Sequence, residues 1–382
     1  MTGPNCTQGC APIKKDPRAA GQGGVTYSAR EFRRWGAIVG DLSFISDNQT
    51  GVHPKVLERL QALSGGNAAG YGEDDWTSMA ESAVQQIFET ECAVFFVSTG
   101  TAANALALSA LSPPWGAIYC HEGAHICNDE NTAVEFYTGG ARLVGVAGPA
   151  GKPDLHAMRA HMEVATVHGV HNAKPTVISL SNVTESGTVY SASELEPYRD
   201  LADRYELRLH VDGARFANAV VSSGATPAAL TWRSGVDCLS FGLTKNGGIA
   251  AEAVVIFDSV LADQFAYRRK RAGHLWSKHR FLAAQWLALL EDDLWLENAR
   301  HANAMAQRLA AAFSAHGSIE LPWSVDANEI FPVIPVEIRH GLREAGFSFY
   351  DWPAQPDMTR FVTSFATDAV AVDQAVALIL GM

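Results

Sequence analysis

The sequence predicts an α/β protein with a large domain, built on a mostly parallel seven-stranded sheet between helices, and a smaller C-terminal α+β domain. Two patterns lead to this fold. Between residues 93 and 257, apolar strand-like segments alternate with helix-like ones, as in a parallel sheet covered on both faces. After residue 330, strand-like segments follow one another without room for long crossover helices, which indicates a smaller α+β domain. The expected division is a tail and arm over 1–43, a large domain over 44–275 and a small domain over 276–382.

Short runs rich in Val, Ile, Leu and Phe predict the strands of the large domain. These runs cover residues 93–97, 117–120, 142–146, 176–180, 207–211, 236–241 and 253–257. Helices fit between several of them. Residues 101–111 are rich in Ala and Leu, and Ser191 with Glu194 forms a capping-box pattern that opens a helix to about Tyr205.

The small domain is predicted from the pattern after residue 276. Residues 276–315 form one long helical pattern. Residues 330–336, 347–350 and 360–365 are strand-like, and 368–380 are helical. Short consecutive strands flanked by helices indicate an α+β unit.

The composition excludes several classes of function. The chain of 382 residues is 47% hydrophobic and 18% charged, which excludes a disordered protein. A net charge of −12 argues against nucleic-acid binding, because phosphate partners need a basic surface. No run approaches the roughly 18 apolar residues of a membrane helix. The six cysteines are scattered, which favours reduced thiols and a cytoplasmic location.

The first 24 residues differ from the rest of the chain. They are rich in Gly, Pro and small residues and lack the apolar core of a secretory signal. Cys6 and Cys10 have no partner pair nearby that would complete a metal site. We therefore expect a flexible tail.

Residues with chemical potential stand where predicted strands end, the edge at which open α/β sheets bind ligands. The turn from Ser98 to Thr101 leads into a helix and suits a phosphate, although an ordinary helix cap is the alternative. Asp212 follows one strand, and Lys245 follows another 33 positions later (245 minus 212). His125 follows a further strand.

Together these residues predict a pyridoxal phosphate site. A lysine amine can form a Schiff base with the cofactor aldehyde. A carboxylate beside the pyridine nitrogen keeps that nitrogen protonated, because an opposite charge favours the charged form. Lys245 and Asp212 are the candidates for these two roles. A covalently bonded amine also explains a lysine at the end of an apolar strand, where a bare ammonium would be costly.

The sequence from about Phe44 to its C-terminus also resembles the threonine aldolases, in particular their low-specificity L-threonine aldolase branch. The motifs that carry the resemblance are FISDNQTGVHP (44–54), GYGEDDWT (70–77), ETECAVFFVSTGTAANALAL (89–108), EGAH (122–125), HVDGARFANA (210–219), FGLTKNGGIAAEAVVIF (241–257) and RFVTSFAT (360–367). The resemblance implies an aminotransferase-like, fold type I pyridoxal phosphate enzyme.

The resemblance also implies roles for individual residues. It makes Lys245 the Schiff-base lysine, Asp212 the partner of the pyridine nitrogen and His125 the residue that stacks on the ring. The phosphate would be held by Ser98, Gly100 and Thr101, and the substrate carboxylate by Ser46, Arg215 and Arg360. Tyr71 would reach in from a neighbouring subunit, and so would a cation of the basic run 267–278. A homo-oligomer with shared sites, a dimer or a tetramer, is therefore expected.

An acidic segment before a predicted helix has two interpretations. Glu73, Asp74 and Asp75 could suggest a metal site, but an acidic turn at a helix N-terminus is the simpler interpretation, so no metal is predicted.

Glu185 stands where many threonine aldolases carry a histidine near the substrate hydroxyl. An ionised glutamate can accept a proton there but cannot donate one.

The implied reaction is reversible retro-aldol cleavage of L-threonine, L-allo-threonine and related L-β-hydroxy-α-amino acids to glycine and an aldehyde. His125 is the first candidate for the base that removes the hydroxyl proton, as a neutral imidazole near pH 7, and Glu185 is the second. The alternatives are an aldolase for phenylserine-type substrates, a pyridoxal phosphate β-eliminating lyase of the same fold, and a non-catalytic protein that binds a phosphorylated ligand.

Overall fold

The computed structural model describes residues 42–353, 355 and 357–382. The predicted N-terminal tail, with Cys6 and Cys10, lies outside the described residues, as does all but the end of the arm predicted over 1–43. None of the helices in the described part of the chain is long and apolar enough to cross a membrane.

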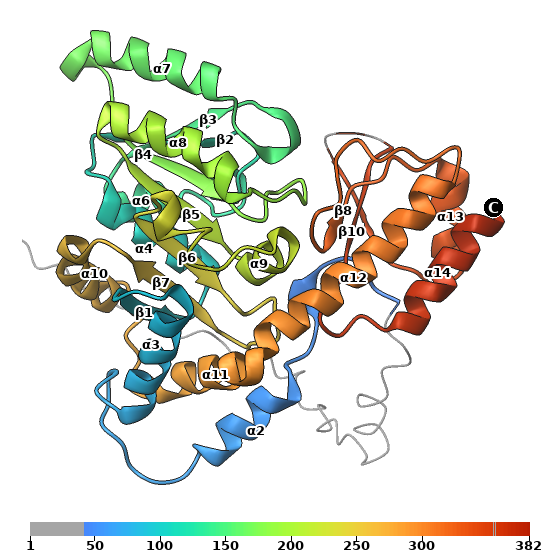
Figure 1. Cartoon of the computed structure of the whole chain (residues 1–382), viewed down its shortest axis with the longest axis horizontal. Coiled ribbons are helices and arrows are strands. Elements are labelled where there is room, and N and C mark those ends of the chain that lie inside the picture. The colour runs from blue at the N-terminus through green and yellow to red at the C-terminus, as the bar shows by residue number, and fades with distance from the viewer. Residues whose placement is uncertain (1–41, 354, 356) are drawn as a thin grey trace, which may run out of the picture. The chain divides into compact units, whose positions relative to one another are not determined.

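A seven-stranded sheet forms the centre of the large domain (Figure 1). Its strands are β1 (Ala93–Val97), β2 (Gly116–His121), β3 (Arg142–Val146), β4 (Lys174–Ser181), β5 (Arg208–Gly213), β6 (Cys238–Gly242) and β7 (Glu252–Ile256). They lie in the order β1-β7-β6-β5-β4-β2-β3. β7 runs antiparallel to both of its neighbours, and the other paired strands are parallel. The prediction of a mostly parallel sheet is confirmed.

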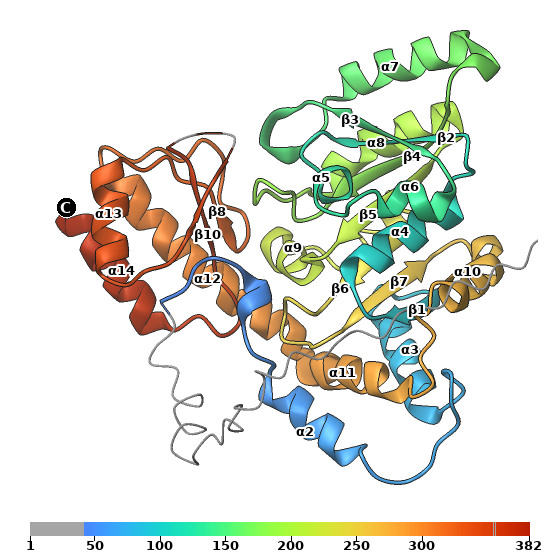
Figure 2. The same ribbon diagram turned by 180° about the vertical axis from the view of Figure 1, so that it is seen from behind.

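The two faces of this sheet carry separate hydrophobic cores, because successive strand residues point to opposite sides. In β2, Tyr119 packs in one core and Ile118 in the other. The helices of this part of the chain, seen from both sides in Figures 1 and 2, are α2 (Pro54–Ala62), α3 (Asp75–Phe88), α4 (Gly100–Leu111), α5 (His125–Asn128), α6 (Ala133–Thr138), α7 (Leu155–Val167), α8 (Ala192–Tyr205), α9 (Phe216–Ser223), α10 (Ser259–Arg271) and α11 (Arg280–Leu290). The predicted capping box at Ser191 and Glu194 opens α8.

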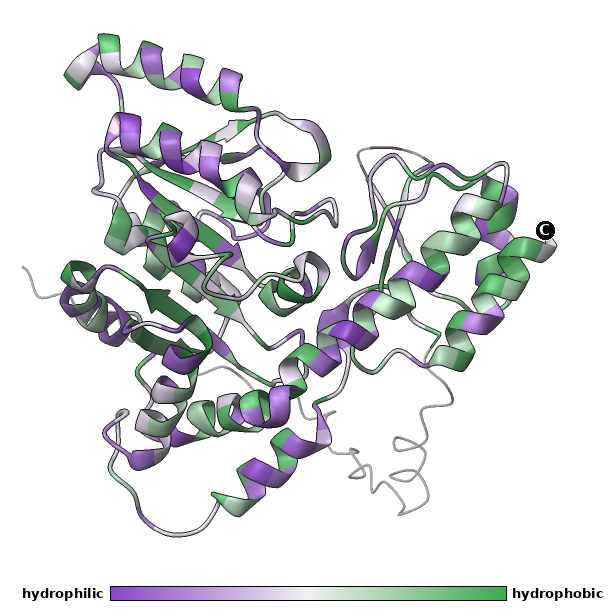
Figure 3. Cartoon of the chain, viewed as in Figure 1, coloured by the Kyte–Doolittle hydropathy of each residue, from purple (hydrophilic) through white to green (hydrophobic). Residues whose placement is uncertain are grey.

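In the described residues after α11, the small domain contains a three-stranded antiparallel sheet and three helices. α11, which lies in the range 276–382 predicted for this domain, packs in the core of the large sheet instead. The strands β8 (Glu329–Ile330), β9 (Tyr350–Asp351) and β10 (Thr359–Val362) lie in the order β8-β10-β9. The helices are α12 (Leu294–Ala315), α13 (Val336–Glu344) and α14 (Ala369–Gly381). Figure 3 shows α12 alternating between hydrophobic and hydrophilic residues, as expected of a helix that covers a core on one side.

Phe44 joins the core of this small domain although it lies far away in the sequence. Its ring stacks on Phe347 with centroids 6.0 Å apart, and its side chain is fully buried. Its backbone oxygen accepts a hydrogen bond from Val362 N at 2.8 Å. The segment that precedes the large domain in the chain is therefore packed onto the small domain.

Several predicted elements were wrong in detail. The strands expected over 347–350 and 360–365 are the shorter β9 and β10. The strand expected over 330–336 is only Glu329–Ile330, because Pro332 and Pro335 lack the N–H group that a strand ladder needs. The single helical pattern expected over 276–315 is broken between α11 and α12. Asp292 and Asp293 adopt φ of 55° there, a left-handed conformation that a continuous α-helix excludes.

Candidate active site

A small cavity of about 80 Å³ lies where β4, β5 and β6 end and α4 begins. Its walls are formed by Gly100, Thr101, Asn104, His125, Glu130, Ser181, Val183, Thr184, Glu185, Asp212, Ala214, Arg215 and Lys245. Seven of the predicted site residues are therefore brought together around one space, namely Gly100, Thr101, His125, Glu185, Asp212, Arg215 and Lys245.

Lys245 lies in a tight turn between β6 and β7, a consequence of the antiparallel direction of β7. The Asn246 side chain donates to Trp295 O at 2.8 Å, and Asn298 donates to Asn246 O at 2.9 Å. Gly247 has φ of 113°, which a residue with a Cβ rarely adopts. The turn is thus fixed by groups other than Lys245, whose half-buried amine remains available for chemistry.

The turn predicted to bind phosphate forms the start of α4. Thr99 caps the helix by accepting from Ala102 N at 3.2 Å. Gly100 and Thr101 lie at the end where helical N–H groups have no partner within the helix. Ser98 is directed elsewhere, because its hydroxyl lies 3.0 Å from Nδ1 of His274, a residue of the basic run 267–278.

Asp212 is buried at the end of β5. Its Oδ2 accepts a hydrogen bond from Nδ2 of Asn104 at 2.8 Å, and its Oδ1 accepts from Ala214 N at 3.0 Å. Asn104 is, with Thr101, a polar residue of α4 that lines the cavity, and sequence patterns did not reveal it. A buried amide inside an Ala- and Leu-rich helix was the available signal, since buried polar groups need partners.

His125 begins α5, and 45% of its side chain is exposed. Its Nδ1 lies 2.9 Å from Oε1 of Glu130, a fully buried carboxyl group. The hydrogen bond to Glu130 raises the pKa of His125, whereas burial lowers it and the net shift is upward. The imidazole is therefore less readily neutral near pH 7 than the sequence alone predicts.

Glu185 follows β4 and faces His125. Its Oε1 accepts from His125 N at 2.9 Å and from the Ser181 hydroxyl at 2.7 Å. Its Oε2 is buried without a hydrogen-bond partner. Burial raises the pKa of Glu185 to about 7, against the lowering effect of these hydrogen bonds. Near neutral pH this carboxyl group can both accept and donate a proton, which an ordinary glutamate cannot do.

Arg215 is held between two carboxylates. Its Nε lies 2.7 Å from Oδ2 of Asp47, its Nη2 2.9 Å from the other Asp47 oxygen, and its Nη1 2.9 Å from Oε2 of Glu329. Burial raises the pKa of Asp47, but the charge and hydrogen bonds of Arg215 outweigh it and the net pKa is lowered. Arg215 therefore joins the N-terminal segment and the small domain to the cavity wall.

Besides Ser98, three predicted site residues lie outside the cavity lining. Ser46 caps a short 3-10 helix through Asn48 N at 3.2 Å. Arg360 donates to Ile45 O at 3.3 Å and lies over the rings of Tyr350 and Trp352. Tyr71 is 52% exposed, with Nζ of Lys270 4.3 Å from its ring centroid. Their predicted roles toward substrate stay predictions.

The acidic turn before α3 acts as a helix cap. Asp74 accepts from Thr77 N and from the Thr77 hydroxyl, both at 2.9 Å. Within the described residues, no cluster of three or more His, Cys, Asp or Glu side chains could hold a metal ion.

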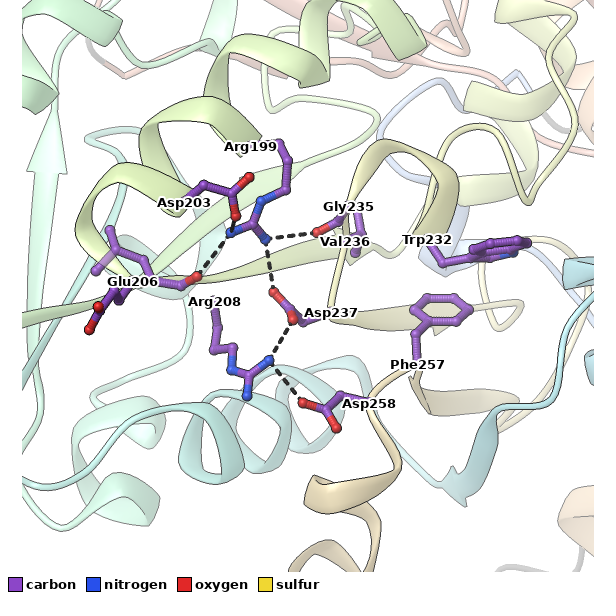
Figure 4. Close-up of a pocket in the computed structure, with 11 residues that line it drawn as sticks. Arg199, Asp203, Glu206, Arg208, Trp232, Gly235, Val236, Asp237, Phe257 and Asp258 are labelled. Carbon is purple, nitrogen blue, oxygen red and sulfur yellow. Dashed lines mark hydrogen bonds and ion pairs between the residues drawn. The ribbon is translucent and has the colours of Figure 1, made fainter.

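A larger cavity of about 680 Å³ lies at the opposite edge of the sheet, where β5 and β6 begin (Figure 4). Asp237 accepts from Arg208 at 2.8 Å and from Arg199 at 3.2 Å, and Arg208 also pairs with Asp258 at 2.9 Å. Both arginines are thus neutralised by neighbouring carboxylates. The network ties the strand starts together and occupies both arginines, so size alone does not identify the site.

Comparisons with known proteins show the family to which the chain belongs. A family model described as "Beta-eliminating lyase" matches residues 43–335. A low specificity L-threonine aldolase of Pseudomonas sp. (strain NCIMB 10558) is 40% identical over 335 residues, 87% of this chain and 96% of that relative. A low specificity L-threonine aldolase of Pseudomonas aeruginosa is 40% identical over 331 residues, 85% of this chain and 93% of the relative.

A solved structure of a threonine aldolase is also similar to this chain. The threonine aldolase of Leishmania major superposes with a TM-score of 0.83 at 30% identity, covering 88% of this chain and 98% of that one. The sheet, the Lys245 turn and every residue of the small cavity lie inside the region matched by the family model. The chain therefore belongs to the threonine aldolases, within the beta-eliminating lyase family of fold type I enzymes.

Proposed function

We propose that this protein cleaves L-threonine and related L-β-hydroxy-α-amino acids to glycine and an aldehyde, with pyridoxal phosphate as cofactor. The observation that carries the proposal is the convergence of Lys245, Asp212, His125 and the start of α4 on one cavity. Family membership supports the same reaction, because relatives that match nearly the whole chain are named low specificity L-threonine aldolases.

The residues around the cavity fit the cofactor. Lys245 offers an amine, Asp212 a buried carboxylate for the ring nitrogen, and His125 a half-exposed ring for stacking. Gly100 and Thr101 offer N–H groups to the phosphate. When bound, the cofactor supplies an electron sink for the pair released as the Cα–Cβ bond breaks.

The chain itself would orient the substrate and move its proton. Arg360, Ser46 and Arg215 are the proposed holders of the substrate carboxylate. Because Arg215 already contacts two carboxylates, we assign it chiefly to positioning and Arg360 to direct contact. We further propose a homo-oligomer, a dimer or a tetramer, in which Tyr71 reaches the site of a neighbouring subunit. A cytoplasmic location is part of the same proposal.

The hydroxyl proton has two proposed acceptors. The unpartnered Oε2 of Glu185 is available as a base once the carboxyl group is ionised. His125 can serve through its other ring nitrogen, because Nδ1 is occupied by Glu130. The structure supports Glu185 more strongly than the sequence does, since its pKa of about 7 suits proton transfer at neutral pH.

Activity is expected to rise as pH increases through about 7, because Glu185 must lose its proton before it can accept another. Glu185→Gln should lower kcat about 10²-fold or more and remove this rise. The check is kcat against pH for both proteins, with Glu163→Gln, an exposed glutamate of α7 that pairs with Arg159, as control. An unchanged profile in Glu185→Gln would assign the base elsewhere.

L-Threonine and L-allo-threonine should both be cleaved, and D isomers should not. The carboxylate clamp fixes Cα, so a D substrate would turn its side chain away from both acceptors. At Cβ, His125 and Glu185 offer two acceptors, so a preference of only about 1–3 kcal/mol is expected. Kinetics of both L isomers on wild type, His125→Asn and Glu185→Gln test this. Cleavage of D-threonine, or a preference beyond about a thousandfold, roughly 4 kcal/mol, contradicts it.

The experiment that tests the proposed function is a substrate panel on the purified protein supplied with pyridoxal phosphate. L-Threonine, L-allo-threonine, L-phenylserine and their D forms are incubated separately, and glycine is measured. Glycine from the L forms is expected. A panel that yields no glycine from any substrate rejects the proposal.

A further inference from the structure

Glu130 lies at the centre of a row of hydrogen bonds that joins two of the proposed cofactor-binding groups. Its Oε1 lies 2.9 Å from Nδ1 of His125 and 2.8 Å from Nδ2 of Asn104. The same Asn104 nitrogen lies 2.8 Å from Oδ2 of Asp212. His125, Glu130, Asn104 and Asp212 thus form one continuous unit, most of it buried.

The bonds in this row have a defined direction. The amide nitrogen of Asn104 carries two hydrogens and only donates, so it gives one to each carboxylate. Burial raises the pKa of Glu130, whereas the hydrogen bond to His125 lowers it and the net shift is upward. While Glu130 is ionised, its Oε1 only accepts, and Nδ1 of His125 then carries the hydrogen between them. In the neutral ring this leaves Nε2 without a proton.

We propose that Glu130 is a positioning residue that fixes the ring orientation and tautomer of His125 and, through the Asn104 amide, holds Asp212 in place. The proposal rests on the proposed function, in which His125 and Asp212 contact the cofactor. Glu130 itself would touch neither substrate nor the reacting bond.

Removing the charge of Glu130 should change the pKa of His125 in a predictable direction. The hydrogen bond and charge of Glu130 raise the pKa of His125, as does Asp212, whereas burial and Lys245 lower it. In Glu130→Gln the carbonyl oxygen can still accept from Nδ1, but the negative charge is gone. The pKa of His125 is therefore expected to fall while the ring stays in place.

The experiment is an NMR titration of histidine in the full chain without cofactor, with the His125 signal identified by its loss in His125→Asn. Glu130→Gln should lower the midpoint of that signal, and Glu130→Asp should restore part of the shift. Glu122→Gln, an exposed neighbour, is the control. With cofactor and L-threonine, kcat of Glu130→Ala should fall about tenfold or more, with little change in KM.

A second variant tests the bridge between the two carboxylates. Asn104→Ala removes the hydrogen-bond donor of Asp212 and of Glu130 together, so the absorption band of bound pyridoxal phosphate should shift. An unchanged His125 midpoint in Glu130→Gln overturns the proposal, and so does an unchanged absorption band in Asn104→Ala. Failure of wild type to bind pyridoxal phosphate would instead reject the proposed function.

A separate observation concerns two thiols beside the same helix. Sγ of Cys120, at the end of β2, lies 3.3 Å from Sγ of Cys127 in α5. Cys120 is fully buried and Cys127 is partly exposed. The contact with Cys120 lowers the pKa of the Cys127 thiol, and Cys127 is also the thiol that a reagent in solvent can reach, so Cys127 is the more reactive of the two.

We infer that Cys120 and Cys127 form a disulfide when a peroxide is present, and that the disulfide displaces His125. The Cys127 thiolate attacks a peroxide oxygen and becomes a sulfenic acid. The Cys120 thiol then attacks that sulfur and water leaves. Two thiols and one hydrogen peroxide thus give one disulfide and two waters, with two electrons passing to the peroxide.

The bond would shorten the sulfur–sulfur distance from 3.3 Å to about 2.05 Å. Cys127 lies two residues after His125 in a four-residue helix, so α5 is expected to shift toward β2. His125 N would then move relative to Glu185, with which it makes a 2.9 Å bond. Because His125 belongs to the proposed active site, the disulfide should reversibly lower the activity of the enzyme. This expectation rests on the proposed function.

In the experiment, the full chain is treated with hydrogen peroxide. It carries Cys6→Ser and Cys10→Ser so that these two thiols cannot react. Peptide mass spectrometry should find residues 120 and 127 linked, and activity should fall and return with dithiothreitol. Cys127→Ser should keep its activity under the same treatment. Absence of the linked peptide, or linkage with full activity, overturns the inference. Lack of glycine formation before oxidation would instead count against the proposed function.

Discussion

Lys245→Ala is expected to lose turnover of L-threonine by about a thousandfold or more and to remove the yellow colour of the bound cofactor. The amine of Lys245 is the covalent anchor in the proposed site, and no other lysine lines the cavity. The fold should persist, because Asn246 and Gly247 hold the turn without the lysine side chain.

The check combines kinetics, absorbance and thermal unfolding on wild type, Lys245→Ala and Lys174→Ala. Lys174 is an exposed lysine at the start of β4, so its replacement should change none of these. If Lys245→Ala kept its colour and near-normal turnover, the assignment of the cofactor lysine would be wrong.

Arg215→Met is expected to lower the free energy of unfolding by about 3–5 kcal/mol, because it leaves the buried carboxylates of Asp47 and Glu329 without their cation. Removing one partner of a buried ion pair costs far more than removing an exposed one. Arg233→Met, which breaks the exposed pair with Glu89, should change stability by less than about 1 kcal/mol.

Denaturant unfolding of both variants and of wild type measures this difference. Activity should fall with Arg215→Met, since the guanidinium forms part of the cavity wall. Equal stabilities for the two variants would show that the Asp47–Arg215–Glu329 cluster is not the junction that the structure indicates.

Much of the large domain could be predicted because its signals are local. The strands β1 and β3 coincide with the apolar runs at 93–97 and 142–146, and α8 begins at its capping box. The meeting of Asp212 and Lys245 also followed from sequence, since the paired strands β5 and β6 are parallel and their carboxyl ends lie at one edge.

What could not be predicted depends on contacts distant in sequence. Asp47 and Arg215 lie 168 positions apart, and nothing near either residue shows that they pair. Glu130 lies in a loop without periodicity, so only the structure shows that it bonds both His125 and Asn104. The break before α12 was visible in principle as the acidic run from Glu291 to Asp293, because a polar turn interrupts the apolar pattern there.

The most direct test of the proposed function is a product balance on L-threonine with the wild-type protein supplied with pyridoxal phosphate. Glycine, acetaldehyde, ammonia and 2-oxobutanoate are measured against the threonine consumed. Cleavage of the Cα–Cβ bond predicts one glycine and one acetaldehyde for each threonine and no ammonia. Ammonia and 2-oxobutanoate in equal amounts, without glycine, would mean elimination instead and would contradict the proposed reaction.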